Sequence, residues 1–193
     1  MPGEDSMGGM NDMSGRRISD NKNDTEKKTN VVLIGMPASG KSTVGIILAK
    51  VLGKDFIDCD LVIQKTTGKL LAGIISEEGA EGFIRTENRI LSSIEAFDSV
   101  IATGGSAVYG EEAMANLCRG SIVVYLRVGF DALKKRLRDI KQRGVVMKPG
   151  QSLEDIYKER TALYEKYADI TIDETGKGIE EVVEEAAEEI RKY

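Results

Sequence analysis

The 193-residue chain contains no histidine. Histidine is the side chain that most often serves as a general base or a metal ligand near neutral pH. Its absence excludes every Ser-His-Asp or Cys-His mechanism and every metal site that depends on imidazole. Any catalysis by this chain must therefore rely on carboxylates, lysine, arginine, hydroxyl groups and the main chain.

Cysteine is scarce as well, because the chain has only Cys59 and Cys118. Two cysteines do not form a disulfide framework, so the sequence indicates a reducing compartment and we expect a cytoplasmic protein. Cys59 lies between Asp58 and Asp60, whose negative charges disfavour a thiolate. We therefore expect Cys59 to be a poor nucleophile.

Long apolar runs and an excess of positive charge are also missing. No hydrophobic stretch approaches the length of a membrane span, so we expect a soluble protein with no membrane partner. The 27 basic residues are outnumbered by 32 acidic ones, which gives a net charge of −5. A nucleic-acid surface would need a basic stripe, so we expect no nucleic-acid partner.

The ends and loops of the chain suggest its domain organisation. Residues 1–28 are polar, rich in glycine and without apolar periodicity, so we expect a disordered tail. Residues 29–193 have the length of a single domain with a substantial core, and we expect a monomer. Residues from about 141 to 150 combine glycines and basic side chains without periodicity, which predicts a mobile lid.

One motif is present in full. The segment from Gly35 to Ser42 reads G-M-P-A-S-G-K-S, which has the spacing of a phosphate-binding P-loop. A β-branched run precedes it at 31–34, and apolar residues at helical spacing follow it until Gly53. Strand, loop and helix in this order aim main-chain N–H groups at an anion. The expected nucleotide-binding residues here are Ala38, Ser39, Gly40, Lys41, Ser42 and Thr43.

Strand and helix patterns alternate along the rest of the chain. Such alternation predicts an α/β fold with a parallel sheet covered by helices on both faces. Strands are expected at 31–34, 55–57, 100–102, 122–126 and 170–172, and helices at 44–52, 61–67, 70–76, 81–97, 111–119, 132–138, 153–167 and 179–190.

Polar groups gather where the predicted strands end, which is where ligands bind in such sheets. Asp58 and Asp60 follow the second strand; one can complete a Mg²⁺ shell and the other can accept a hydrogen bond from an attacking hydroxyl. Asp60 could instead cap the next helix. The Gly104-Gly105 turn after the third strand offers N–H donors for an anion, or is an ordinary tight turn. Arg143 and Arg160 fit phosphoryl transfer, or are solvated surface residues.

These residues together resemble the shikimate kinase family of small P-loop kinases, over residues 30 to about 175. The ordered combination is more specific than the P-loop alone, because many families share that loop. The matching pieces are 35–45, Phe-Ile-Asp-Cys-Asp at 56–60, Gly79 with Phe83 and Glu87, Ala-Thr-Gly-Gly at 102–105, Val-Val-Tyr-Leu at 123–126, Arg160 to Tyr164, and Ala168-Asp169.

The resemblance implies a three-layer fold with a five-stranded parallel sheet and the ATP-dependent phosphorylation of a hydroxyl on shikimate, a step of aromatic amino acid biosynthesis. Its cofactor would be Mg²⁺, and its partners ATP and a small hydroxy acid. By position, Ser42 and Asp58 would serve the metal, and Lys41 and Asp60 would be catalytic. The further implied residues are Arg143 on the transferring phosphate, Arg136 against adenine, and Gly104, Gly105, Ser106 and Arg160 on the acceptor.

The sequence departs from the family pattern in the acceptor half. The family carries an arginine directly after Phe83, where this chain has Ile84 with Arg85 one step further round the helix. The third glycine of the family's turn is Ser106, and the lid reads R-G-V-V-M at 143–147. Two alternatives follow: a kinase for a different hydroxy acid, and a catalytically idle nucleotide-binding regulator. Ile84 could equally have joined the core face of its helix.

Overall fold

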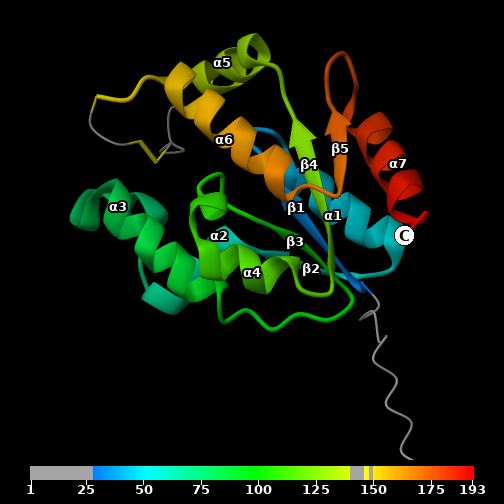
Figure 1. Ribbon diagram of the computed structural model, residues 1–193, viewed down its shortest axis with the longest axis horizontal. Helices are drawn as coiled ribbons and strands as arrows, with labels where there is room; N and C mark the ends of the chain where they lie inside the picture. Colours follow the sequence, from blue (N-terminus) through cyan, green and yellow to red (C-terminus); the bar gives the residue numbers. More distant parts are fainter. Residues whose placement is uncertain (1–27, 140–145, 148–149) are drawn as a thin grey trace, which may run out of the picture.

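The computed structural model describes residues 28–139, 146–147 and 150–193. They form a five-stranded, all-parallel sheet with helices on both faces, which confirms the predicted fold class (Figure 1). The order β2-β3-β1-β4-β5 puts β1 in the centre of the sheet. The strands are β1 (Asn30–Ile34), β2 (Asp55–Asp58), β3 (Ser99–Ala102), β4 (Ser121–Arg127) and β5 (Ile170–Asp173).

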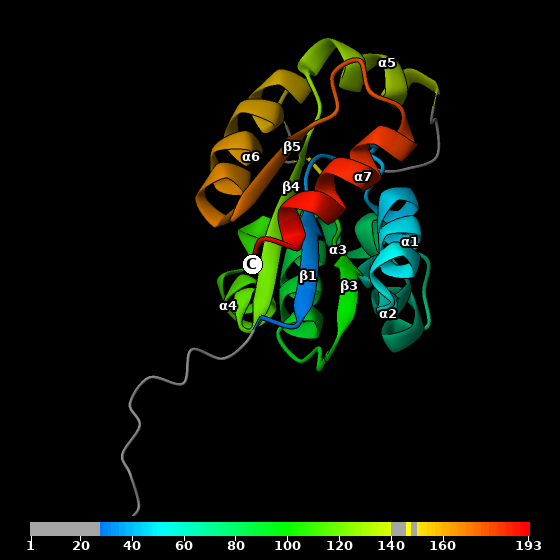
Figure 2. The same ribbon diagram turned by 90° about the vertical axis from the view of Figure 1, so that its right-hand side faces the viewer.

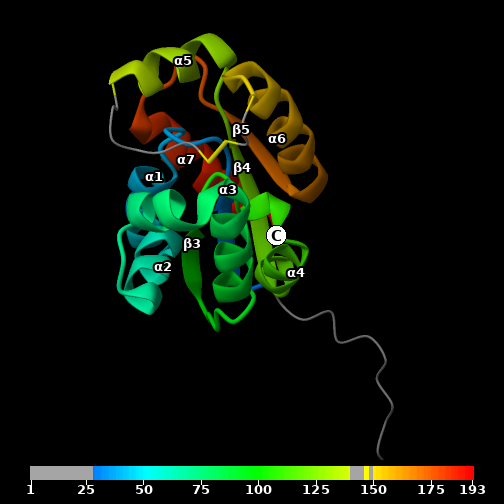
Figure 3. The same ribbon diagram turned by 90° about the vertical axis from the view of Figure 1, so that its left-hand side faces the viewer.

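Helices cover each face of the sheet, as Figures 2 and 3 show from opposite sides. Two helices, α1 (Lys41–Leu52) and α7 (Ile179–Ile190), pack on one face. The opposite face is covered by α2 (Cys59–Thr67), α3 (Leu71–Leu91), the 3-10 turn η1 (Ala107–Tyr109), α4 (Glu111–Cys118) and α6 (Leu153–Tyr167), with Leu133 of α5 (Phe130–Asp139). In the described part of the chain, no helix has the length and apolar character needed to cross a bilayer.

The central strand supplies side chains to both layers. Val31 and Leu33 belong to the core under α1 and α7, while Val32 and Ile34 belong to the core on the other face. All four are essentially inaccessible to solvent, which is why the strand reads as a continuous apolar run without polar alternation.

Only part of the apolar pattern of the first helix is buried. Val44 and Leu48 belong to the core, whereas Ile47 and Val51 are 37 % and 47 % exposed. Gly45 and Ala49 are buried instead, because a Cβ on Gly45 would already lie 2.7 Å from the Phe56 ring. The helix therefore packs on the sheet through the small residues Gly45 and Ala49 as well as through Val44 and Leu48.

Helix α3 contains the predicted break and ends earlier than predicted. Gly79 has φ 70° and ψ 179°, a conformation that residues with a Cβ rarely adopt, and it kinks the helix where we expected two helices to separate. The predicted extension to Phe97 is wrong, because the helix ends at Leu91 and Phe97 is 76 % exposed. Ile84 is partly buried against the core, as the simpler interpretation expected.

The carboxyl ends of β1, β2 and β3 meet at one edge of the sheet, because the strands are parallel and paired in register. Asp58 is the last residue of β2, and the P-loop and Thr103 follow β1 and β3 directly, which brings the predicted functional segments together. The predicted tail, apart from Lys28, and most of the predicted lid, including Arg143, lie outside the described residues.

Candidate active site

The segment between β1 and α1 is a tight loop with little room for side chains. Gly35 has φ 148°, and a Cβ there would lie 2.6 Å from the main-chain oxygen of Leu126 in β4. Helix α1 begins at Lys41, and the preceding Gly40 provides no side-chain cap. The N-terminal end of α1 therefore retains its partial positive charge, which suits a phosphate group.

Lys41 is held against this loop. Its side chain is buried, and Nζ donates hydrogen bonds of 2.8 Å to the carbonyl oxygens of both Gly35 and Met36. Nζ also lies 3.4 Å from the hydroxyl oxygen of Ser39. These contacts place a positive charge at the loop, where it can compensate the charge of a terminal phosphate.

The two aspartates after β2 have different local roles. Asp58 is the N-cap of α2, because its Oδ1 accepts hydrogen bonds from the N–H groups of Asp60 at 2.9 Å and Leu61 at 3.3 Å. The alternative in which Asp60 caps this helix is therefore wrong. Asp60 lies in the first turn of α2, and both carboxyl groups line the same cavity as Lys41.

That cavity has a volume of about 490 Å³ and joins the P-loop to the ends of β2 and β3. Most of the residues predicted for the site line it: Ala38, Gly40, Lys41, Ser42, Thr43, Asp58, Asp60, Gly104, Gly105, Ser106 and Arg160. Ser39 is buried inside the loop, and Arg136 lies beside it. An apolar wall completes the cavity, formed by Leu61, Leu70, Leu71, Ala72, Ile75 and Phe83.

The glycine turn after β3 is packed closely against its neighbours. A Cβ on Gly105 would lie 2.6 Å from Cδ of Pro37 in the P-loop, so this glycine lets the turn touch the nucleotide loop. The carbonyl oxygen of Gly105 accepts a 2.6 Å hydrogen bond from the hydroxyl of Tyr164, which comes from α6. The turn therefore contacts both the P-loop and α6.

Arg160 is a buried cation in the wall of the same cavity. Helix α6, which carries it, begins with a capping box between Ser152 and Asp155. The guanidinium lies 5.2 Å from the ring centre of Tyr109, and Nη2 donates a 2.5 Å hydrogen bond to the carbonyl oxygen of Val146. Nη1 is buried without a partner among the described residues, so it can bind an anionic oxygen of a ligand.

Glu87 is a site residue that the sequence analysis did not assign. It is 1 % exposed on α3, and its Oε2 accepts a 2.6 Å hydrogen bond from the Ser106 hydroxyl. Burial raises the pKa of Glu87 to about 7, although the bond from Ser106 acts in the opposite direction. One signal could have revealed it: Glu87 falls on the apolar face of its helix, four residues after Phe83 and three before Ile90.

Arg136 is tied to the nucleotide loop by a carboxylate that was also missed. Its Nη1 donates to the carbonyl oxygen of Ala38 at 3.2 Å and pairs with Glu174 at 2.7 Å. Glu174 is almost fully buried, and burial raises the pKa of its carboxyl group. A contact of Arg136 with adenine remains a prediction, but its place beside the loop is compatible with one.

Cys59 is fully buried between the cavity-lining residues Asp58 and Asp60, and its surroundings disfavour the thiolate. Burial raises the pKa of its thiol well above the ordinary value, and the carboxylates of Glu87, Asp60 and Asp58 raise it further. The direction agrees with the sequence-based expectation, but burial is the larger cause.

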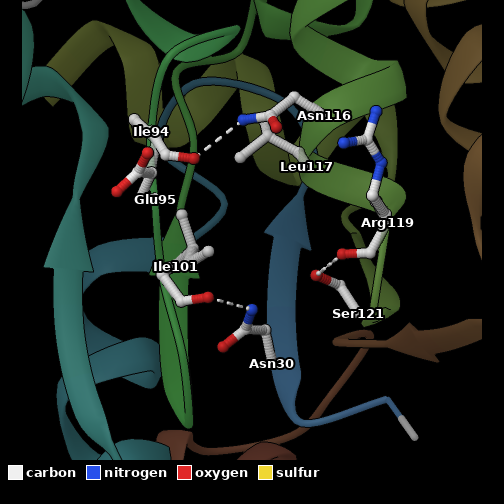
Figure 4. Close-up of a pocket in the computed structure, with 9 residues that line it drawn as sticks. Asn30, Ile94, Glu95, Ile101, Asn116, Leu117, Arg119 and Ser121 are labelled. Carbon is white, nitrogen blue, oxygen red and sulfur yellow. Dashed lines mark hydrogen bonds between the residues drawn. The ribbon is translucent and has the colours of Figure 1, made fainter. Parts of the chain in front are cut away.

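A second cavity of about 250 Å³ lies at the opposite edge of the sheet (Figure 4). Its amide side chains are already engaged in the fold. Asn30 donates to the carbonyl oxygen of Ala96 at 2.8 Å and accepts from the N–H of Ser99 at 3.0 Å. Asn116 donates to the carbonyl oxygen of Ile94 at 2.9 Å. These groups hold the loop after α3 in place, which explains them without a ligand.

The residues of the larger cavity fit a magnesium ion only together with phosphate and water. Within the described residues, no three Asp, Glu, Cys or His side chains come close enough to hold an ion by themselves. Mg²⁺ in phosphoryl-transfer sites typically takes one or two protein oxygens and completes its shell with water and substrate phosphates. Ser42 and Asp58, which both line the cavity, are the expected protein groups.

Comparison with known proteins points to one family. The family model described as shikimate kinase matches residues 37–191. Shikimate kinase from Haemophilus influenzae is 38 % identical over 150 residues, covering 76 % of this chain and 83 % of the relative. Shikimate kinase from Nitrosospira multiformis is 40 % identical over 151 residues, covering 77 % of each chain.

Solved structures agree with the sequence relatives. The chain matches shikimate kinase from Acinetobacter baumannii in complex with shikimate at a TM-score of 0.72 and 33 % identity, covering 86 % of this chain and 93 % of the other. It matches shikimate kinase from Aquifex aeolicus at a TM-score of 0.70 and 32 % identity, covering 84 % and 96 %.

Proposed function

Because the chain belongs to the shikimate kinase family and is a phosphotransferase, we propose that it transfers the γ-phosphoryl group of ATP to a hydroxyl group of shikimate. The observation that carries the proposal is the single cavity that joins the P-loop to Asp60 and the buried Arg160. A nucleotide on the loop and a small hydroxy acid at Arg160 would share one enclosed space.

The acceptor end of the cavity has the chemistry of a cyclic hydroxy acid. The partnerless Nη1 of Arg160 suits a carboxylate oxygen, since a buried guanidinium favours a charge-assisted contact. Leu71, Ile75 and Phe83 offer an apolar wall for a ring. Asp60 supplies a carboxylate that can accept the hydrogen of a ring hydroxyl.

The nucleotide end supplies positioning and charge compensation. The N-terminus of α1 and Lys41 would bind the phosphates, and Arg136 beside Ala38 would contact the base. Magnesium, held through Ser42 and Asp58, would neutralise phosphate charge when bound. The lid predicted at 141–150 would add Arg143 and exclude water.

In the transfer itself the acceptor oxygen forms the new bond to the γ-phosphorus, and the bond from that phosphorus to the bridging oxygen of ADP breaks. Asp60 accepts the proton of the attacking hydroxyl and passes it to solvent. Lys41 at the loop compensates the charge that develops on the transferring group. The chain's own groups thus orient two substrates and balance charge, without a covalent intermediate.

A matched pair of lysines on α1 tests this proposal through coupled ADP release with shikimate. Lys41→Ala removes the buried ammonium group at the loop and should cost about 3 kcal/mol of transition-state stabilisation, roughly 100-fold or more in kcat. Lys50→Ala removes an exposed lysine of the same helix and should leave kcat unchanged. Shikimate-independent ADP release by the wild-type protein, or equal kcat in both variants, would refute the assignment.

The remaining expectations belong to the same proposal. We infer that the protein acts as a cytoplasmic monomer, since its two cysteines form no disulfide framework and its length is that of a single domain. Light scattering coupled to gel filtration tests the oligomeric state. The two alternatives, a different hydroxy acid and an idle regulator, are not favoured by the relatives, and a screen of hydroxy acids in the same assay would reveal either.

A further inference from the structure

Glu87 is the group of the cavity that the proposed reaction leaves unused. Its Oε2 accepts the hydrogen bond from Ser106, whereas Oε1 is buried without a partner among the described residues. A buried carboxylate oxygen without a donor costs free energy, so such an atom in a cavity wall indicates a contact that a ligand completes.

The partnerless oxygen borders the acceptor end of the cavity. A Cβ on Gly104 would collide with Oε1 of Glu87 and would lie 3.2 Å from Oδ1 of Asp60. Both carboxyl groups and Gly104 line the cavity. A hydroxylated ligand seated on this turn can therefore give one hydroxyl hydrogen to Asp60 and another polar hydrogen to Glu87.

Charged groups act on Glu87 from three neighbouring helices. Asp60 on α2 repels its negative charge, while Arg160 on α6 and Lys41 on α1 attract it. On its own helix, the residue three positions earlier is the uncharged Ile84, which packs against the core. Residues three apart on a helix are neighbours, so a cation at position 84 could have reached this carboxylate.

Two of the departures of the sequence from its family pattern, at positions 84 and 106, thus adjoin the same carboxyl group. Ile84 is one helical turn away, and Ser106 donates the hydrogen bond to it. A hydroxyl donor fixes the plane of the carboxyl group but, unlike a cation, brings no opposite charge to it.

We propose that Ser106 is a positioning residue of the acceptor site, which aims Oε1 of Glu87 at a polar hydrogen of the acceptor where position 84 offers no cation. The proposal rests on the proposed function for the identity of the acceptor, but the contact itself exists in the ligand-free protein. Because the bond from Ser106 lowers the pKa of Glu87 against the effect of burial, its loss also has a signature without substrate.

Steady-state kinetics test the role of Ser106 in the reaction. Ser106→Gly removes the donor and should raise KM for shikimate about 10-fold or more, since a hydrogen bond to a charged group is at stake. KM for ATP should change less than about 2-fold, because Lys41 and its loop are untouched. Ser99→Ala is the matched control: it removes a buried hydroxyl that bonds to the Phe97 carbonyl oxygen at 2.9 Å, far from the cavity.

A rescue variant separates positioning from general damage. Ile84→Arg in the Ser106→Gly background places a guanidinium one turn from Glu87 and should return KM for shikimate to within about 3-fold of the wild-type value. Equal increases of both KM values in Ser106→Gly, or a double variant no better than the single one, would overturn the proposal.

A titration of the ligand-free protein separates this inference from the proposed function. Side-chain carboxyl NMR should show a higher pKa for Glu87 in Ser106→Gly than in the wild type, and no change in Ser99→Ala. An unchanged Glu87 pKa would overturn the contact even if shikimate is phosphorylated. A wild-type protein that is inactive with shikimate but shows the pKa change would refute the acceptor and leave Ser106 as the group that orients Glu87.

Discussion

Replacing Glu87 by glutamine should change how the stability of the protein depends on pH. The pKa of this buried carboxyl group is raised from its ordinary value of 4.5 to about 7, mainly by burial. In the unfolded chain the group returns to its ordinary value. Between these two values the folded state holds a proton that the unfolded state has released.

The sign and the magnitude follow from linkage. Because the folded state binds more protons between pH 4.5 and pH 7, the free energy of unfolding falls as the pH rises through this range. Each unit of pKa is worth about 1.36 kcal/mol, so the full loss by about pH 8 is roughly 3 kcal/mol. Below pH 4.5 the group is protonated in both states and this loss is absent. The glutamine of Glu87→Gln does not titrate, so the free energy of unfolding of this variant lacks this loss.

Urea denaturation followed by circular dichroism measures the effect. The free energy of unfolding of Glu87→Gln, relative to the wild type, should rise by about 3 kcal/mol between pH 4.5 and pH 8. Glu112→Gln is the control, because the pKa of this exposed carboxyl group is lowered, mainly by its bond from Asn88, and its contribution has the opposite sign. A difference for Glu87→Gln that stays constant across this pH range would refute the burial argument.

Two further predictions concern packing. Gly45→Ala should lower the free energy of unfolding by about 1–3 kcal/mol, because the new Cβ would lie 2.7 Å from a ring carbon of Phe56 in β2. At Gly73 a new Cβ meets nothing within 4 Å, so Gly73→Ala should stabilise α3 by up to about 1 kcal/mol. Thermal unfolding of both variants measures these changes, and equal effects would contradict the close approach of Gly45 to Phe56. Tyr164→Phe should lower the free energy of unfolding by about 1–3 kcal/mol, because it leaves the Gly105 carbonyl oxygen without its 2.6 Å donor. Tyr193→Phe removes an exposed hydrogen bond and should lower the free energy of unfolding much less. Similar losses for both variants in chemical denaturation would show that the hydrogen bond to Gly105 does not stabilise the protein.

Much of the fold could be predicted because it depends on local patterns. The bounds of α6 and α7 agree with their predicted ranges, since each has an apolar periodicity and a clear start: Ser152 in a capping box for one, and Gly178 before acidic residues for the other. The break at Gly79 was predictable because glycine adopts a positive φ without steric cost. The helix that was predicted to extend to Phe97 shows the limit of local patterns, because nothing in the nearby sequence marks Leu91 as its end.

The candidate site was predictable where a short sequence motif adopts a known local structure. The P-loop residues, the aspartate pair and the glycine turn each carry local chemistry, and parallel strands bring their ends to one edge. Glu87 was named among the segments that resemble the family but was given no role, and Glu174 was not singled out, because an isolated glutamate in a helix or a loop has no local motif. Their importance comes from burial and from the partners Ser106 and Arg136, which lie 19 and 38 residues away in the chain.

The sequence by itself therefore determined the class of chemistry: a nucleotide loop, carboxylates and arginines, with no histidine to serve any other mechanism. Only the tertiary structure decided which of these groups share a cavity and which of their atoms remain without partners. The physical reason is that burial and long-range contacts set the protonation and orientation of a carboxyl group. In the sequence Glu87 has no assigned role, and only burial in the packed fold, beside Ser106, raises its pKa and makes it part of the cavity wall.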